Sequence, residues 1–548
     1  MSPGIGTYWH TVRHLRPVQV YGRIWHGVTR PRIDHGPAPA LRALLAERWT
    51  PPAAREPSML APARFRFLNE THELSDAGWD DPALSRLWRY NLHYFDDLTS
   101  RDASERADWH RALIDRWIRE NPPARGTGWE PYPTSLRIVN WLEWWLAGNV
   151  LSPAAAQSLA VQIRWLARRL ETHILGNHLF ANAKALVFAG FAFEGLEGEQ
   201  WLEQGRRLLA REVPEQILDD GGQFERSPMY HALALEDVLD LCNLAAAAGD
   251  LPARWRPLMA DWRARTAAMR HWLAAMCHPD GEISFFNDAA MGVAQSRAAL
   301  EAYAGRLGLG AAPSVGAGVT HLEPSGYVRL ETGAAVALLD VAPVGPDYLP
   351  GHAHADTLSF ELSLFGQRVL VNSGTSRYGI GAERARQRGT AAHNTVVIDG
   401  ADSSEVWGGF RVARRARPIA LAVDEGPPHS VQCAHDGYRR LAGHPVHHRE
   451  WTLDATSLVV ADRVVGHAAE AEARFHLHPD VAATTMDGGV TLTLPRGESV
   501  TFMAERGRCR IEDASWHPRF GADVPTRCVV VTLEADGALV RVTWQERA

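Results

Sequence analysis

The sequence predicts a multidomain fold, with helix hairpins in the N-terminal part and an antiparallel β domain in the C-terminal part. Apolar residues recur every three or four positions from roughly residue 80 to 310, as in amphipathic helices. After a Gly, Pro and Ala loop near 311–320 the period becomes two, as in strands. The 548 residues also exceed what one core accommodates. We therefore expect an extension and linker at 1–75, a helical domain at 76–315 and an antiparallel β domain at 316–548.

Composition and charge narrow the class of protein. Hydrophobic residues make up 46% and charged residues 22% of the chain, which is typical of a globular protein. The net charge of −7 argues against a general nucleic-acid binder. Lys184 is the single lysine, so a locally basic cleft for an acidic substrate would have to use arginine. The 5 cysteines show no CxxC spacing, which argues against a disulfide framework or a zinc finger.

The N-terminal residues 1–25 lack the continuous apolar stretch of a signal peptide. No run of residues approaches the length of a membrane span. We therefore expect a cytoplasmic protein without a membrane span. A chain that had lost its leader would look the same, and it would then be periplasmic or secreted.

The helical part follows an extension rich in Arg, His and Pro, in which we expect one short helix near 8–25. Gly, Pro and Asp residues separate the later helical segments. Such helices in series predict hairpins, either stacked as a solenoid or closed as a toroid. The clearest periodic segments are 138–145, 160–170, 201–210, 235–248 and 255–276.

The C-terminal part alternates apolar and polar residues in many short runs. These predict an antiparallel sandwich or stacked sheets, with the natural site in a cleft between the two parts. Phe365-Gly366-Gln367 reads as a hairpin turn. The expected strands are 327–330, 335–341, 357–364, 369–371, 395–398, 450–453, 458–460, 473–477, 490–494 and 529–533.

A histidine-rich stretch leads into the expected strand at 357–364. His352, His354 and Asp356 alternate there, so in an extended chain they would point the same way, roughly 7 Å apart. Such a cluster can bind a metal, move protons or do both. The chain has 25 histidines, so composition alone could also produce a His-x-His pair.

Two segments of the helical part carry further polar groups. In 176–186, His178 would neighbour Asn182, while Lys184 is either a needed point charge or half of a buried ion pair. In 219–231, Ser227 and Pro228 form a helix start that puts Tyr230 in the first turn. The positive end of the helix dipole would favour a phenolate there, which suits a base.

Four short motifs, in this order, resemble the heparinase II/III-like family of polysaccharide lyases, which includes relatives acting on alginate. The resemblance covers roughly residues 85–420. It implies an N-terminal α/α toroid of helix hairpins, here the toroid domain at 76–315, and a C-terminal antiparallel β-sandwich, here the sandwich domain at 316–548. The motifs are Asn177-His178 with Asn182 and Lys184, Ser227-Pro228-Met229-Tyr230-His231, His352-Ala353-His354-Ala355-Asp356 and His393-Asn394-Thr395.

The resemblance implies β-elimination on a uronic-acid-containing polysaccharide that is glycosaminoglycan-, alginate- or exopolysaccharide-like. Such a lyase neutralises the uronate carboxylate, removes the C5 proton and supports the departing O4 oxygen. By resemblance, Asn177 binds the carboxyl group and Tyr230 transfers protons as base, acid or both. His178 and His352 share the base and charge-stabilising roles.

The resemblance also implies one divalent metal, zinc or another, in a structural role. His354 and His393 are the histidine ligands by resemblance. Asn372 stands where the family has an aspartate, and a neutral amide is the poorer zinc ligand.

We expect four further residues to bind substrate, namely Arg137, Asn140, Glu225 and Arg377. The two arginines suit a bidentate contact with carboxylate or sulfate, although structural roles remain open. The expected partner is an acidic polysaccharide or oligosaccharide rather than nucleic acid.

Two other functions remain open. A glycoside hydrolase on a similar toroid would need paired carboxylates, and the clustered candidates are Asp219, Asp220 and Glu225. A non-catalytic glycan-binding protein of an exopolysaccharide system would need neither a base nor an acid.

Overall fold

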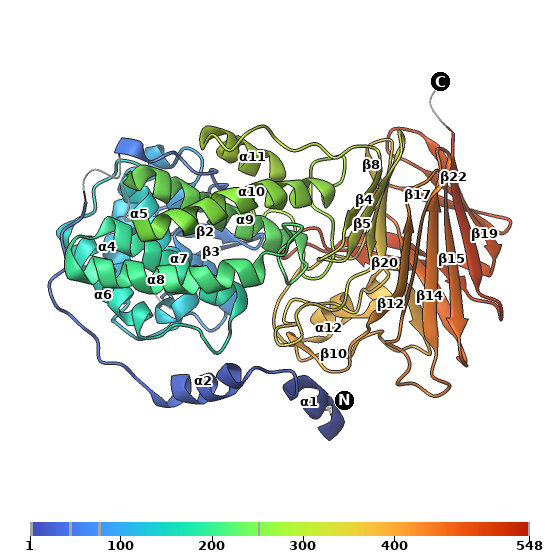
Figure 1. Ribbon diagram of the computed structural model, residues 1–548, viewed down its shortest axis with the longest axis horizontal. Helices are drawn as coiled ribbons and strands as arrows, with labels where there is room; N and C mark the ends of the chain where they lie inside the picture. Colours follow the sequence, from blue (N-terminus) through green and yellow to red (C-terminus); the bar gives the residue numbers. More distant parts are fainter. Residues whose placement is uncertain (1–3, 43–46, 75–77, 250–252, 546–548) are drawn as a thin grey trace.

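The computed structural model describes residues 4–42, 47–74, 78–249 and 253–545. Helices come first and antiparallel strands second, which confirms the predicted fold class (Figure 1). We call residues 86–306 the helical half and residues 318–544 the sheet half.

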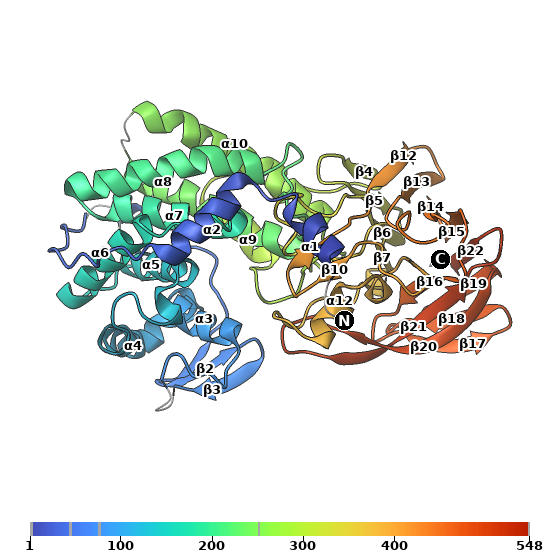
Figure 2. The same cartoon turned by 90° about the horizontal axis from the view of Figure 1, so that it is seen from below.

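An N-terminal arm precedes both halves and consists of α1 (Ile5–Val12) and α2 (Pro17–Val28). Two helices thus replace the single one expected, because Pro17 begins a new helix at its first position. The arm runs along the outside of the molecule, past the helical half and onto the sheet half (Figures 1 and 2). A small sheet then follows, formed by β1 (Met59–Ala61), β2 (Arg64–Phe67) and β3 (Glu70–Glu73).

The helical half contains helices in two layers. In one layer α3, α5, α7 and α9 pack side by side in that order, and α6, α8 and α10 each pack against the helix they follow. Its helices are α3 (Arg86–Tyr94), α4 (Ala107–Glu120), α5 (Pro131–Leu146), α6 (Pro153–Ala167), α7 (Gly176–Ala192), α8 (Gly195–Gln216), α9 (Pro228–Ala248), α10 (Arg256–Ala275) and α11 (Arg297–Arg306).

This layering brings helix starts together. Helices of the first layer run the same way because an outer helix returns the chain between them. The ring of Tyr132, at the start of α5, lies 4.4 Å from that of His178, at the start of α7. A Cβ on Gly176 would lie 3.4 Å from Oε1 of Glu225, which shortly precedes α9. The first turns of α5, α7 and α9 therefore share one rim, which faces the sheet half.

The sheet half contains three sizeable antiparallel sheets. The first has the order β4 (Gly318–Leu322), β5 (Tyr327–Glu331), β6 (Ala335–Asp340), β7 (Phe360–Leu364) and β8 (Gln367–Leu370). The second has the order β12 (Pro418–Asp424), β13 (His429–His435), β14 (Val446–Leu453), β15 (Ser457–Val465), β22 (Ala538–Trp544), β19 (Ser499–Arg506), β18 (Gly489–Thr493) and β17 (Ala482–Met486). The third has the order β20 (Arg508–Trp516), β21 (Val524–Thr532), β16 (Ala471–His476) and β9 (Val396–Ile398). The sheet half also contains a separate two-stranded ribbon, formed by β10 (Val406–Trp407) and β11 (Arg411–Val412), and the helix α12 (Ala382–Arg388).

One apolar core joins the three sheets into a sandwich. The Phe360 ring of β7 lies 6.3 Å from Trp451 of β14 and 6.2 Å from Phe475 of β16. The predicted turn between β7 and β8 is confirmed, with positive φ at Phe365 (52°) and Gly366 (76°), as in the commonest tight hairpins.

The expected strand at 357–364 begins later than predicted, because β7 starts at Phe360. Leu358 has a φ of 65°, which an extended strand does not allow. The histidine stretch before it is therefore a loop between the halves. No helix within the described ranges is both long and apolar enough to cross a bilayer.

Candidate active site

The site lies where the shared rim of helix starts meets the loops of the sheet half. His178 is the third residue of α7, and Tyr230 is the third residue of α9. The first turn of a helix presents unpaired N–H groups and the positive end of its dipole. A rim of such turns favours an anionic group, such as a carboxylate.

Tyr230 connects the two halves directly. Its ring stacks on His352 with centroids 3.8 Å apart and planes 18° apart. Its hydroxyl shares a hydrogen bond of 2.9 Å with that of Tyr378. The Ser227 hydroxyl accepts the Tyr230 N–H at 3.2 Å and donates to the Asp288 carbonyl at 2.5 Å. This helix cap fixes where the phenol stands.

Tyr230 is a neutral phenol in this site. Burial, together with the neighbouring Tyr378, raises the pKa of Tyr230 well above its ordinary value. The expectation that the helix dipole would favour a phenolate is therefore wrong here, because desolvation outweighs the dipole. A neutral phenol is a proton donor to a departing oxygen.

His352 is held by a buried carboxylate. Its Nδ1 lies 2.7 Å from Oε2 of Glu225, a side chain that is only 2% exposed. A carboxylate at Nδ1 favours the tautomer with its proton there, which leaves Nε2 free to accept a proton. The prediction that Glu225 contacts substrate is corrected, because its carboxylate is buried against His352 and Gln223.

His178 is paired with a different carboxylate. Its Nδ1 lies 3.0 Å from Oε1 of Glu171, whose Oε2 accepts a hydrogen bond from Asn182 at 3.0 Å. Burial opposes the charged imidazole, but the Glu171 carboxylate outweighs it and the pKa of His178 is raised. Asn177, one residue earlier, is only partly buried at the rim. An imidazole whose charged form is favoured and an amide are thus neighbours in the chain at this rim.

Two of the four predicted substrate-binding residues are structural instead. Arg137 is fully buried, donates to Gln162 at 2.9 Å and to the Gly128 carbonyl at 2.8 Å, and lies over the Trp117 ring. Asn140 is corrected likewise, because its amide donates to the backbone of Tyr94 and to Asp96, both at 2.8 Å.

Arg377 is exposed, next to Tyr378 in the chain, and its substrate contact stays a prediction. Lys184 resolves as a buried ion pair, with Nζ 2.7 Å from Asp237 and 2.6 Å from Asp240. It therefore braces α7 against α9 rather than reaching the rim.

The carboxylate pair that a hydrolase would need does not form. Asp219 is exposed. Asp220 accepts hydrogen bonds from the Ser325 N–H at 2.9 Å and its hydroxyl at 2.6 Å. Glu225 is committed to His352. Each of the three candidates thus has a separate environment.

A second cluster lies behind the first and contains His354, Asp356 and His393, all buried. One ligand atom from each lies within 4.8 Å of the others, and His354 Nδ1 lies 3.2 Å from His393 Nε2. Asn372 as the third ligand stays a prediction. Its side-chain oxygen accepts the Asn394 N–H at 3.1 Å, and Asp356 offers a carboxylate oxygen to the same two histidines. His352 does not share a face with His354 and Asp356, since the loop turns it toward Tyr230.

This cluster fits a divalent metal. Two nitrogens bound to zinc at about 2.0–2.1 Å in a tetrahedron stand about 3.3 Å apart, close to the distance here. Burial lowers the pKa of His354 to about 4 and that of His393 to about 3, so both imidazoles are neutral, the form that ligates. His354 Nε2 lies 2.8 Å from Asp288, the outer carboxylate that ligating histidines usually have. Burial raises the pKa of Asp356, and a bound cation would stabilise its carboxylate against this effect.

Five residues of these clusters are not predicted from the sequence, namely Tyr132, Glu171, Asp288, Tyr378 and Arg384. Tyr378 follows Arg377, and Glu171 lies 7 residues before His178, so closeness in the chain could have suggested both. Asp288 and Arg384, paired at 2.7 Å, are 96 residues apart, and no local pattern links them.

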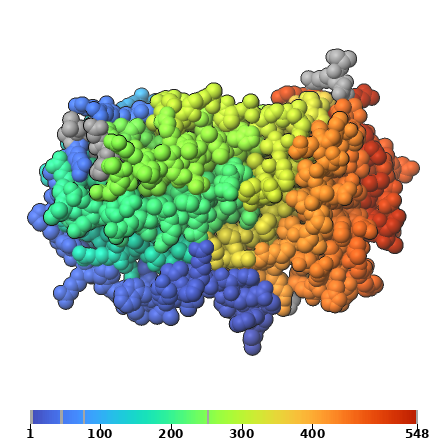
Figure 3. Space-filling model, in the orientation of Figure 1, coloured from blue at the N-terminus to red at the C-terminus, as the bar shows by residue number. Residues whose placement is uncertain are grey.

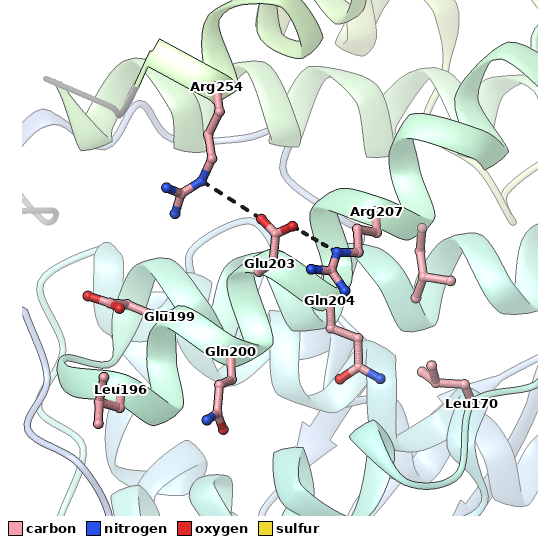
Figure 4. Close-up of a pocket in the computed structure, with 9 residues that line it drawn as sticks. Leu170, Leu196, Glu199, Gln200, Glu203, Gln204, Arg207 and Arg254 are labelled. Carbon is pink, nitrogen blue, oxygen red and sulfur yellow. Dashed lines mark hydrogen bonds and ion pairs between the residues drawn. The ribbon is translucent and has the colours of Figure 1, made fainter.

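A groove of about 700 Å³ lies elsewhere, on the outer surface of α8. Glu203 stands there between Arg207 and Arg254, at 2.8 Å and 3.8 Å (Figure 4). The other lining side chains include Leu196, Glu199 and Gln200. This groove lacks a histidine or tyrosine for proton transfer, so the chemistry belongs to the rim.

Two family models match consecutive parts of the chain. The model described as Heparinase II/III N-terminus matches residues 93–306, and that described as Heparinase II/III-like, C-terminal matches residues 315–545. A heparin-sulfate lyase of Bacteroides stercoris is 23% identical over 419 residues, which are 67% of this chain and 59% of that protein. The chain thus matches less than two thirds of that relative's length.

Solved structures agree on the fold. A crystal structure of heparinase III gives a TM-score of 0.70 at 19% identity, covering 96% of this chain and 88% of the other. A heparan sulfate lyase mutant from Pedobacter heparinus gives 0.61 at 17% identity, covering 97% and 88%. Both family matches follow one another over most of the sequence. The chain therefore belongs to the heparinase II/III-like family.

Proposed function

We propose that the protein is a polysaccharide lyase that cleaves a uronic-acid-containing polysaccharide by β-elimination. One observation carries the proposal, namely the stack of Tyr230 on His352, 3.8 Å apart, beside the helix starts that hold Asn177 and His178. Family membership supports it, as does the name of the heparin-sulfate lyase from Bacteroides stercoris. The acidic polysaccharide is the proposed partner of this cleft.

The electrostatics favour one assignment of roles. His178, whose pKa the Glu171 carboxylate raises, would neutralise the uronate carboxylate together with Asn177. His352, with Glu225 at Nδ1, would take the C5 proton through Nε2. Tyr230, whose pKa burial raises, would donate its proton to the departing O4 oxygen. For His178 and Tyr230 the direction of the pKa shift thus favours the protonated form that the proposed role requires.

The metal belongs to the same proposal. His354, Asp356 and His393 would hold one divalent ion, zinc by the chemistry of the donors. The bound ion would hold His354, which lies two residues after His352, and so would stabilise the loop that carries both histidines. We expect elemental analysis to find about one ion per chain, and Asp356→Asn to lower its affinity on the order of tenfold or more. Equal metal content in both proteins would contradict this ligand set.

The decisive experiment incubates the full chain with a panel of uronate polymers and follows the ultraviolet absorbance of the unsaturated product. We expect turnover on at least one polymer and a loss of about 10²–10⁴-fold in kcat for Tyr230→Phe. Tyr438→Phe is the matched control, because Tyr438 is a buried tyrosine that donates to the Val396 carbonyl inside the sheet half. New reducing ends without unsaturation would overturn the lyase assignment.

The part boundaries also remain our proposal, with an extension at 1–75, a toroid domain at 76–315 and a sandwich domain at 316–548. The last helix before the change ends at Arg306 and the next strand begins at Gly318, which supports the second boundary. Small sheet strands β1 to β3, which lie ahead of α3, support the first.

A further inference from the structure

The N-terminal arm has its apolar side outward. In α1, Ile5, Trp9 and Val12 form one stripe whose side chains are between 48% and 91% exposed. In α2 a second stripe is between 52% and 73% exposed and consists of Val20, Tyr21, Ile24, Trp25 and Val28. A helix on a globular surface normally buries such a stripe and exposes its polar side. Here the amphipathic order is reversed.

Polar contacts hold the arm in this orientation. Gln19 donates to the Tyr348 carbonyl at 3.0 Å, and Gly22 packs so closely on His173 that an added Cβ would lie 3.1 Å from its Cβ. Arg169 donates to the Thr29 carbonyl at 2.7 Å. The inward side of α2 is therefore glycine and polar groups, so the outward stripe is a consequence of specific docking.

The first helix is fixed to the sheet half in the same manner. Trp407 donates to the Thr11 hydroxyl at 3.1 Å, and the Tyr8 ring meets the Trp407 ring at 5.0 Å. Both apolar stripes are thus carried on a rigid body. The arm that carries them lies along one side of the molecule, across both halves (Figures 2 and 3).

The charge of the arm differs from that of the rest of the chain. Residues 1–33 contain five arginines and no aspartate or glutamate, whereas the whole chain has a net charge of −7. Arg23, Arg30 and Arg32 are exposed, and none of them forms an ion pair within the described part of the chain. The arm itself is therefore positively charged beside its apolar stripes.

We propose that the arm docks the protein onto the surface of an anionic lipid bilayer, lying in the interface rather than spanning it. Interfacial helices combine an apolar face that includes aromatic rings with arginines at its edge, and bind by apolar burial together with attraction to anionic headgroups. The arm has each of these features. Tryptophan and tyrosine rings, here Trp9, Tyr21 and Trp25, suit the headgroup level.

A second copy of the chain fits the arm less well. Two arms meeting face to face would bring their unpaired arginines together, which repels at ordinary ionic strength. A membrane instead supplies negative charge and apolar depth at once. The proposal stands apart from the lyase chemistry, because docking requires no residue of the rim.

The test is flotation of the full chain with vesicles of phosphatidylcholine, with or without phosphatidylglycerol. We expect binding to the vesicles with phosphatidylglycerol, weak binding to pure phosphatidylcholine, and release as salt screens the attraction. The triple variant Trp9→Ser, Ile24→Ser and Trp25→Ser should lower the partition coefficient on the order of tenfold or more. Arg23→Gln with Arg30→Gln and Arg32→Gln should remove the preference for phosphatidylglycerol.

The matched control removes equally exposed apolar side chains outside the arm, with Val150→Ser, Leu196→Ser and Ile380→Ser. This control should bind as the wild type does, and unchanged melting temperatures should show that all variants are folded. The proposal is overturned if the wild-type protein fails to float. It is also overturned if the triple arm variant floats as well as the wild type does. A dimer that is seen by light scattering without lipid, and that the arm variant abolishes, overturns it as well.

Discussion

At the scale of single residues, each of the two imidazoles at the rim is paired with a buried carboxylate. Glu171 lies 3.0 Å from His178 and raises its pKa, which favours the imidazolium. Glu225 lies 2.7 Å from Nδ1 of His352, which leaves the other nitrogen to accept a proton. The same side-chain type thus serves two purposes, and the partner decides which.

The first prediction concerns the alkaline limb of activity. If the imidazolium of His178 neutralises the substrate, activity falls as pH rises through its raised pKa. Glu171→Gln should move this limb to lower pH, because burial then acts on His178 without the compensating carboxylate. A pH profile of kcat/KM on the cleaved polymer measures the limb.

The same pair has a stability counterpart with a definite sign. Since the folded pKa of His178 exceeds the ordinary value of 6.5, its contribution is full below pH 6.5 and is lost as pH rises through the folded pKa. Thermal melts of wild type and Glu171→Gln should therefore differ most at acidic pH. If Glu171→Gln changes neither the alkaline limb of activity nor the pH dependence of the melting temperature, His178 does not have the charge-stabilising role.

At the scale of elements, the starts of α7 and α9 decide where the reactive groups stand. Gly176 begins α7 with a φ of 55°, and an added Cβ would lie 2.4 Å from Cδ2 of Leu349. That close approach seats the sheet half against the first turn. Ser227 caps α9 and at the same time donates to the Asp288 carbonyl. Helix starts here are also domain contacts.

The second prediction uses that cap. Ser227→Ala should cost about 1 kcal/mol of unfolding free energy and also lower kcat, because Tyr230 loses its fixed backbone. Ser152→Ala is the matched control, since Ser152 caps α6 through the Ala155 N–H at 3.1 Å and lies outside the clusters. It should lose similar stability and retain kcat. Denaturant unfolding and product absorbance measure the two quantities, and equal losses of kcat would deny the cap a positioning role.

At the scale of the whole molecule, one buried carboxylate joins the halves. Asp288, at the end of the helical half, lies 2.7 Å from Arg384 of α12 and 2.8 Å from His354. Its N–H also donates to the His352 carbonyl at 2.9 Å. Both Asp288 and Arg384 are almost fully buried, so each charge is stabilised against the cost of burial mainly by the other.

The third prediction removes that charge. Asp288→Asn leaves the buried Arg384 guanidinium without a compensating charge, so we expect a loss of roughly 3–5 kcal/mol in unfolding free energy. Metal affinity should also fall, since His354 loses its outer carboxylate. Asp513→Asn is the control, because its pair with Arg527 lies at the surface and should change neither quantity measurably. Calorimetry and elemental analysis decide, and a fully stable Asp288→Asn protein would contradict this account of the interface.

The class of fold could be predicted from the sequence alone. Hydrophobic periods of 3.6 and 2 follow from helix and strand geometry, and both are visible within short stretches of sequence. The sequence also marked His178, Tyr230, His352, His354 and His393, whose neighbours in the chain carry recognisable motifs. Only the tertiary structure decided that Arg137 and Asn140 are buried supports, since burial depends on which helices meet. The tertiary structure likewise determines that His352 and His354 point to different clusters. The direction of a loop side chain depends on its partners, and for His352 this partner is Glu225, more than a hundred residues away. No local pattern in the sequence predicts such a contact.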